Sequence, residues 1–262
     1  MQQYFLIREN KELKLSENDL YHFKVVMRGK NNDEFIGIID SKRYYFRYKT
    51  TKDSYYLEEL YEIESDSELG KDIRLYQALI RNENFDLVVQ KSTELGVKEI
   101  VPTVFDRNVV KIEKNKEDNK IARYQSIASM ASNQSHRNVI PEVLRPINVL
   151  DIKLSDGEFG LVAYEKNKDT KSLSALKDDL LKSSKISIVI GPEGGITEKE
   201  YNTLINKGFK SISLGKRILR SETASISLLS MLDYIIECEE NWRAEVSFLY
   251  KKPHGLWLKN VK

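Results

Sequence analysis

The sequence predicts a small β-barrel or β-sandwich over residues 1–70, followed by an α/β layer fold. The chain has 262 residues, which is enough for one or two domains. In residues 1–70, short runs rich in tyrosine and β-branched residues alternate with turn signals, as in small all-β domains. From residue 71 onward, short apolar runs alternate with amphipathic stretches, a pattern typical of βα units built around a parallel sheet.

Four runs in the first part are predicted as β-strands, at 3–7, 34–40, 43–48 and 55–63. Turn-forming residues separate them, at 29–33 and at 40–42. The stretch 53–70 then carries seven acidic residues and no base, and it ends at Gly70. We therefore expect the boundary between the two parts near residues 65–71.

The second part is predicted to hold five strands, at 73–80, 99–104, 159–164, 186–190 and 210–214. Amphipathic spacing predicts helices between them, at 85–95, 119–134, 197–207 and 222–237. The third helix begins with a capping box of Thr197 and Glu200, and Gly208 closes it. The last helix is apolar nearly all round, so we expect it to pack on its own sheet and on a second subunit.

The composition excludes several classes of protein. Hydrophobic residues make up 40% and charged residues 31% of the chain, which argues against disorder. The single cysteine, Cys238, excludes an internal disulfide framework, and the three histidines show no metal-ligand spacing. We find no signal peptide and no apolar stretch near the ~18 residues of a membrane-spanning helix. We therefore expect a cytoplasmic protein without a bound metal.

Two glycine-bearing loops are the strongest candidates for a binding site. Residues 191–195 read Gly-Pro-Glu-Gly-Gly and follow the predicted strand 186–190, and residues 214–220 read Leu-Gly-Lys-Arg-Ile-Leu-Arg and follow the strand 210–214. Open α/β sheets bind ligands at the carboxyl ends of their strands, and glycine lets backbone approach a ligand closely. Two tight strand–helix turns would also explain this spacing. Neither loop has the spacing of a dinucleotide-binding or Walker motif.

These loops and three other segments resemble a known family. Residues 191–195 and the motif LGKRILRSETA at 214–224 are similar to the cofactor loops of the 16S ribosomal RNA (uracil-N3)-methyltransferases of the SPOUT superfamily. The segments QKSTELGVKEIVP at 90–102 and ASNQSHRNVIP at 131–141 are similar to the same family. The occurrence of His22 together with Val-Met-Arg at 26–28 resembles that family's PUA-like domain.

The resemblance implies a PUA-like, RNA-binding β-barrel at 1–70 and a methyltransferase domain at 71–237 whose carboxyl end forms a deep trefoil knot. It also implies a homodimer that uses S-adenosylmethionine to methylate N3 of a uridine in the decoding region of 16S rRNA, within the small ribosomal subunit. By resemblance, the residues that bind the cofactor are Gly191, Pro192, Glu193, Gly194, Gly195, Leu214, Gly215, Arg217, Ile218, Leu219, Thr223 and Ala224.

The chemistry of the acceptor suggests two catalytic residues. Uracil N3 carries a proton, so the site must promote its loss and stabilise negative charge on O2 and O4. Arg220 is the candidate for the stabilising cation. Glu222, or Glu193 in its place, is the candidate for the proton acceptor. Alternatively, Arg220 and Glu222 form a structural pair, and Glu193 only caps the following helix.

RNA contacts are expected from Arg8, His22, Arg28, Lys91, Gln134 and Arg137. Each also has a structural alternative to RNA binding. His22 would be a partly buried histidine of the barrel, and Lys91 would form an ion pair with Glu94. Gln134 and Arg137 would be solvated side chains at the end of a helix.

Two other functions stay open at this point. One is a noncatalytic RNA-binding homologue, and the other is a methyltransferase for a ribose 2′-hydroxyl or another base. Residues 238–262 have no counterpart in the resemblance. We predict that they form a β-hairpin of strands 244–250 and 256–261, which packs on the body or adds RNA contacts.

Overall fold

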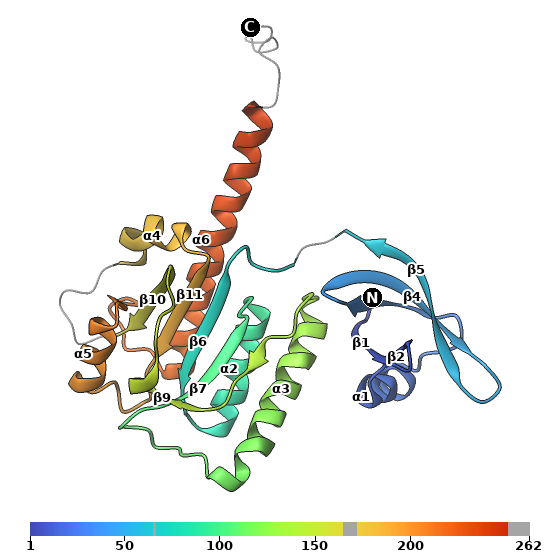
Figure 1. Ribbon diagram of the computed structural model, residues 1–262, viewed down its shortest axis with the longest axis horizontal. Helices are drawn as coiled ribbons and strands as arrows, with labels where there is room; N and C mark the ends of the chain where they lie inside the picture. Colours follow the sequence, from blue (N-terminus) through green and yellow to red (C-terminus); the bar gives the residue numbers. More distant parts are fainter. Residues whose placement is uncertain (65–66, 165–171, 251–262) are drawn as a thin grey trace, which may run out of the picture.

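The computed structural model describes residues 1–64, 67–164 and 172–250, and for 239–250 it describes the backbone alone. The chain forms two β-sheets joined by a short linker (Figure 1). The first sheet is a strongly curved half-barrel of five strands in the order β2-β1-β3-β4-β5. Its strands are β1 (Gln3–Glu9), β2 (Glu12–Leu15), β3 (Glu34–Ile39), β4 (Lys42–Thr50) and β5 (Tyr55–Ile63).

All four strands predicted in this part are present, but no structure was predicted for the segment between the first two of them. That segment holds β2, a short helix α1 (Glu17–Tyr21) and a π-helical turn at His22–Val26. Ser16 caps α1 by accepting a hydrogen bond from the backbone of Asp19 at 3.1 Å. The π-helical turn matters because it places Phe23 in an aromatic core with Tyr4, Phe35, Phe46 and Tyr48.

The second sheet is parallel throughout and has the order β12-β10-β11-β6-β7-β8, with β9 pairing to β7. Parallel strands need crossover connections, which here place helices on both faces of the sheet. The strands are β6 (Asp72–Ala78), β7 (Glu99–Val104), β8 (Glu142–Val143), β9 (Ile147–Asn148), β10 (Glu158–Ala163), β11 (Lys185–Ile190) and β12 (Lys210–Ile212).

Helices cover both faces of this sheet. On one face lie α2 (Asn82–Glu94), α3 (Glu117–Gln134), α4 (Lys177–Lys182) and α6 (Ser221–Tyr250), which share a core with inward side chains of the strands. On the other face lies α5 (Glu198–Asn206), whose Tyr201 and Leu204 pack in a second core. The predicted α/β layer fold is therefore confirmed, and so is the capping box of α5 between Thr197 and Glu200.

The last helix is longer than the sequence predicted. It was expected to end at residue 237, but α6 continues to Tyr250 and its end stands clear of the rest of the molecule in Figure 1. The predicted hairpin strand 244–250 is therefore wrong, and its partner 256–261 lies outside the described residues. Residues 221–250 contain no glycine or proline, so no residue in this range interrupts the helix.

Candidate functional site

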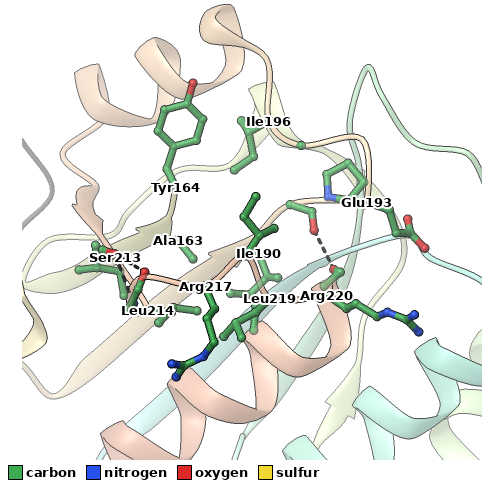
Figure 2. A pocket seen from close by; sticks show the side chains of 18 residues that line it. Ala163, Tyr164, Ile190, Glu193, Ile196, Ser213, Leu214, Arg217, Leu219 and Arg220 are labelled. Atoms are coloured by element: carbon green, nitrogen blue, oxygen red, sulfur yellow. Dashed lines mark hydrogen bonds between the residues drawn. The ribbon is translucent and has the colours of Figure 1, made fainter. Parts of the chain in front are cut away.

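A cavity of about 250 Å³ lies at the carboxyl edge of the parallel sheet, where β10, β11 and β12 end (Figure 2). The loop after β11 and the loop between β12 and α6 form most of its wall. The lining residues are Ala163, Tyr164, Ile190, Gly191, Pro192, Glu193, Gly195, Ile196, Ile212, Ser213, Leu214, Gly215, Arg217, Ile218, Leu219, Arg220, Ser221 and Ala224.

The first loop is a tight turn that presents backbone to the cavity. The N–H of Gly195 donates a 2.8 Å hydrogen bond to the carbonyl of Pro192, and Gly195 adopts a φ of 75°. At Gly191 a Cβ would lie 2.6 Å from Cγ1 of Ile196. Glycine at 191 therefore lets the loop pack directly on Ile196 at the cavity wall.

The second loop supplies apolar and cationic side chains. Gly215 has a φ of 114°, and a Cβ there would meet no atom within 4 Å, so the space beside it is open. Leu214 and Leu219 pack on the sheet, whereas Ile218 is 83% exposed. Arg217 and Arg220 point away from each other on opposite sides of Leu219 (Figure 2). The loop thus combines an exposed apolar side chain with three exposed cations, Lys216, Arg217 and Arg220.

A buried polar network joins the two loops from beneath. Gln77, at the carboxyl end of β6, is fully buried, and its Nε2 donates a 2.9 Å hydrogen bond to Oγ of Ser221. Ser221 Oγ in turn donates to the carbonyl of Gly191 at 2.7 Å, as drawn in Figure 2. Ser225 Oγ donates to Oε1 of Gln77. The first turn of α6 is therefore fixed to both β6 and the 191–195 loop.

Most residues predicted to bind the cofactor line this one cavity. The exceptions are Gly194 and Thr223. At Gly194 a Cβ would lie 2.9 Å from both the Cβ and the carbonyl oxygen of Arg107, so this glycine makes room for another loop. Thr223 is exposed on the first turn of α6. Spacing along the chain could not separate these two from the lining residues.

The structure places the two predicted catalytic residues differently. Arg220 is exposed and lines the cavity. Glu222 is only 8% exposed and does not line it, and its Oε2 has no hydrogen-bond partner among the described residues. Within the described part of the chain, no ion pair joins Arg220 to Glu222. The alternative in which these two residues form a structural pair is therefore not observed.

Arg137, predicted to bind RNA, is buried and makes structural contacts. It is 2% exposed and forms a 2.5 Å ion pair with Glu68 of the linker. Its Nη1 also donates to the carbonyls of Thr93 and Val97 at 3.0 and 2.7 Å. Arg137 follows His136, whose φ of 57° turns the chain inward, and a helix-based periodicity could not show that turn.

The same segment fastens the half-barrel to the parallel sheet. Gln3 of β1 donates a 2.6 Å hydrogen bond to the carbonyl of Arg137, and Arg43 of β4 donates to Gln3 and to the carbonyl of His136. Gln3 and Arg43 are 1% and 8% exposed. Burial and the nearby charge of Arg43 lower the pKa of His136. This joint is built mainly from backbone acceptors and neutral or cationic donors.

The other residues predicted to bind RNA lie on the surface or near it. Arg28 and Gln134 are exposed, and Arg8 is exposed but 3.5 Å from Asp40. Lys91 forms an ion pair with Glu94 at 2.9 Å, and His22 is half-buried, with Nδ1 2.9 Å from the hydroxyl of Tyr4. Lys91 and His22 therefore make the structural contacts that were named as the alternatives to RNA binding.

Comparisons with known proteins agree with this architecture. A family model described as an RNA methyltransferase domain matches residues 67–233. The chain belongs to this RNA methyltransferase family. Ribosomal RNA small subunit methyltransferase E of Bacillus subtilis is 31% identical over 253 residues, covering 90% of this chain and 98% of that protein. The enzyme of the same name from Mesomycoplasma hyopneumoniae is 32% identical over 230 residues, covering 86% and 96%.

A solved member of the family has the same fold. Ribosomal RNA small subunit methyltransferase E of Neisseria gonorrhoeae, bound to S-adenosylmethionine, superposes with a TM-score of 0.78 at 29% identity, covering 90% of this chain and 98% of that one. Both predicted features, the family and its cofactor class, agree with that structure.

For this member of the RNA methyltransferase family, sequence reasoning missed Ala163, Tyr164 and Gln77. Ala163 ends β10, Tyr164 follows it, and both line the cavity. The rule that drew attention to the other two loops, ligand binding at the carboxyl ends of parallel strands, also applies to β10 and could have found them.

Among the described residues, no three His, Cys, Asp or Glu side chains are grouped to hold a metal ion, and no helix is long and apolar enough to cross a membrane.

Proposed function

We propose that this protein transfers a methyl group from S-adenosylmethionine to N3 of a uridine in the decoding region of 16S rRNA. One observation carries the proposal: the two glycine-bearing loops build a single cavity at the carboxyl edge of the sheet, in a chain aligned nearly end to end with enzymes named ribosomal RNA small subunit methyltransferase E. A protein that modifies ribosomal RNA would act in the cytoplasm.

The residues present fit S-adenosylmethionine. Ile190, Leu214 and Leu219 offer an apolar wall for the adenine ring, and the open space beside Gly215 lets a ligand approach the backbone. The cofactor would supply an electrophilic methyl group on a positively charged sulfur, which needs no metal. The chain's own residues would bind the adenosyl group, orient it and exclude water from it.

Arg220 is proposed to stabilise the acceptor. Arg220 lines the cavity, is exposed, and forms no ion pair among the described residues, so its guanidinium is available to bind the developing charge on the uracil O2 or O4. Glu193, which lines the cavity and is exposed, is better placed than the buried Glu222 to receive the N3 proton. Glu222 remains a candidate only for relaying that proton.

We further propose that the half-barrel, a PUA-like domain at 1–70, binds the RNA through Arg8 and Arg28, and that Gln134 of α3 adds a contact from the domain at 71–237. Two such chains would form a homodimer through the outer face of α6, where Met231 and Tyr234 are 38% and 70% exposed. We also infer a trefoil knot at the cavity loops. The sheet order supports it, because β12 pairs with β10 and not with β11, the strand before it.

The decisive experiment maps methylated uridines in ribosomal RNA from cells with and without the gene. We expect one N3-methyluridine in the decoding region to disappear on deletion and to return with the wild-type gene. Purified protein should also transfer labelled methyl groups from S-adenosylmethionine to small subunits from the deletion strain. Loss of a ribose or other base methylation would favour the other methyltransferase reading, and no lost methylation would favour a noncatalytic RNA binder.

A further inference from the structure

Apart from Arg43, which donates to Gln3 and to the carbonyl of His136, the arginines whose side chains are described divide into two groups by their partners. Those with a carboxylate within 4.0 Å are Arg8, Arg47, Arg74, Arg123, Arg137 and Arg145. In the part of the chain whose side chains are described, Arg28, Arg81, Arg107, Arg217 and Arg220 have no such partner, and all five are exposed. An unpaired exposed guanidinium keeps its charge and most of its five donors available for an anion.

Four of these five unpaired arginines lie at one edge of the molecule. Arg81 follows β6, Arg107 follows β7, and Arg217 and Arg220 lie between β12 and α6. Each of these positions is at the carboxyl edge of the parallel sheet, because β6, β7 and β12 run in the same direction. We call these four residues the arginine band. The cavity opens at the same edge, with Arg217 and Arg220 in its wall.

Arg107 is held at this edge by a loop that three hydrogen bonds fix in place. The backbone N–H of Asp106 donates a 2.8 Å hydrogen bond to Glu200, a carboxylate that is fully buried in α5. Asn108 accepts a 2.5 Å bond from the N–H of Phe105 and donates to the carbonyl of Leu79. A buried carboxylate is costly unless it is hydrogen-bonded, so its use here marks a loop whose position is closely fixed.

The guanidinium itself is turned to solvent beside the cofactor loop. Nη1 of Arg107 donates a 3.3 Å bond to the carbonyl of Gly194, and Glu193 and Gly195 on either side of that glycine line the cavity. The bond that Asn108 makes to Leu79 ties this loop to the segment that carries Arg81. Arg81 caps α2 through its backbone, with no hydrogen bond from its side chain. Both side chains are therefore placed by their backbones, and among the described residues the 3.3 Å bond from Arg107 to Gly194 is the one hydrogen bond that either guanidinium forms.

We propose that Arg81 and Arg107 bind the phosphodiester backbone of the substrate RNA where a strand crosses the mouth of the cavity. This inference rests on the proposed function and assigns it two new substrate-contacting residues. A polyanionic strand matches cations that are spread along an edge and form no ion pair among the described residues, because each planar guanidinium can bind one phosphate through two donors. Phosphate contacts position a strand without reading its bases, so these two residues would contribute affinity and register.

The test compares two double variants that lose the same charge. R81Q/R107Q removes the two unpaired arginines, whereas K98Q/R123Q removes two exposed cations that are paired with Asp72 and Asp86 away from the cavity. For each protein, affinity for a single-stranded fragment of 16S rRNA is measured against salt concentration, and affinity for S-adenosylmethionine is measured by calorimetry. Thermal unfolding checks that each variant folds.

For R81Q/R107Q we expect RNA affinity to fall about tenfold near 0.1 M salt, and the slope of log K against log salt to flatten by about 1.4, or about 0.7 per lost contact. Affinity for S-adenosylmethionine should stay within twofold. R81K/R107K should restore most of the slope, because it keeps both charges. The control variant should keep the wild-type slope.

An unchanged slope in R81Q/R107Q, or an equal change in K98Q/R123Q, would overturn the proposal. A loss of S-adenosylmethionine binding equal to the loss of RNA binding would also overturn it, since Arg107 would then only support the 191–195 loop. A wild-type protein that binds RNA with the expected slope but transfers no methyl group would instead contradict the proposed function.

Discussion

Gln77 and Ser221 are 144 positions apart in the chain, yet a 2.9 Å hydrogen bond joins their side chains in the core beneath the cavity. Ser221 passes the connection on to the carbonyl of Gly191. Arg220 immediately precedes Ser221, so this chain of hydrogen bonds fixes the backbone from which the candidate catalytic arginine extends. The position of Arg220 thus depends on a buried amide that lies in a different strand–helix unit.

Replacing Gln77 with methionine should loosen this connection while keeping the core filled. The buried hydroxyls of Ser221 and Ser225 would each lose a partner, so we expect the free energy of unfolding to fall by about 1–3 kcal/mol. Affinity for S-adenosylmethionine should fall about tenfold, equivalent to ~1.4 kcal/mol. Urea unfolding and calorimetry measure the two effects. Ser225→Ala keeps the Gln77–Ser221 bond and should leave cofactor affinity nearly unchanged; an equal loss in both variants would contradict the assignment.

Gly215→Val should block the cavity. The added side chain would enter the open space beside the loop, and we expect cofactor affinity to fall by more than about tenfold. The backbone at Gly215 has a positive φ, so the variant also costs stability, by roughly 1–2 kcal/mol. Gly157→Val is the matched control, because Gly157 has a φ of 74°, open space around it and no place in the cavity wall. Equal cofactor affinity in the two variants would remove Gly215 from the site.

Arg220→Ala should separate binding from chemistry. With its side chain exposed and unpaired in the described structure, its loss should leave folding and cofactor affinity nearly intact. Methyl transfer should fall by about a hundredfold or more, the usual effect of removing one donor that stabilises developing charge. Single-turnover methylation of small subunits measures this rate. A variant with wild-type turnover would show that Arg220 has no catalytic role.

Arg137→Met tests the reassignment of a residue that the sequence placed on the RNA. Removing one partner of a buried ion pair deprives Glu68 of its cation and two carbonyl groups of the Arg137 donor, and we expect stability to fall by about 3–5 kcal/mol. The neighbouring exposed Gln134 provides the contrast: Gln134→Ala should leave stability within about 0.5 kcal/mol of the wild type. A stable Arg137→Met protein with weakened RNA binding would restore the original prediction.

The sequence was informative where one local signal decided the structure. Strand β7 at 99–104, the capping box at Thr197 and both cavity loops follow from short-range patterns, and the structure contains all of them. The features that the sequence did not indicate depend on long-range contacts. Gly194 is explained by Arg107 and the burial of Arg137 by Glu68, and neither partner is near in sequence. The end of α6 was predicted wrongly for a different reason. Residues 244–250 alternate only partly between apolar and polar, and such a pattern is also compatible with a helix that no glycine or proline interrupts.

A last relationship links charge to acid stability at the amino edge of the parallel sheet, opposite the cavity. Arg74 of β6 forms an ion pair with Glu99 of β7, and Lys185 of β11 lies 3.6 Å from the same carboxylate. Burial alone would raise the pKa of Glu99, but the hydrogen bond from Arg74 and the two positive charges outweigh it and lower the pKa. Glu158 also has a lowered pKa: burial opposes the shift, and its hydrogen bonds with Ser187 and Ser155 outweigh burial.

The direction of these shifts fixes the pH dependence of folding. A carboxyl group whose pKa is lower in the folded protein than in the unfolded chain contributes its full stability above the unfolded value, near 4.5, and loses it as pH falls through the folded value. We therefore expect the free energy of unfolding to decrease as the pH drops below about 4.5.

Glu99→Gln should make that decrease shallower and lower stability at pH 7, because it removes the titrating group and its ion pair. Urea unfolding at a series of pH values measures both effects. Glu142→Gln, an exposed residue of β8 with the same charge change, should keep the wild-type profile. If Glu99→Gln and wild type lose stability in parallel below pH 4.5, the network around Arg74 does not govern acid stability.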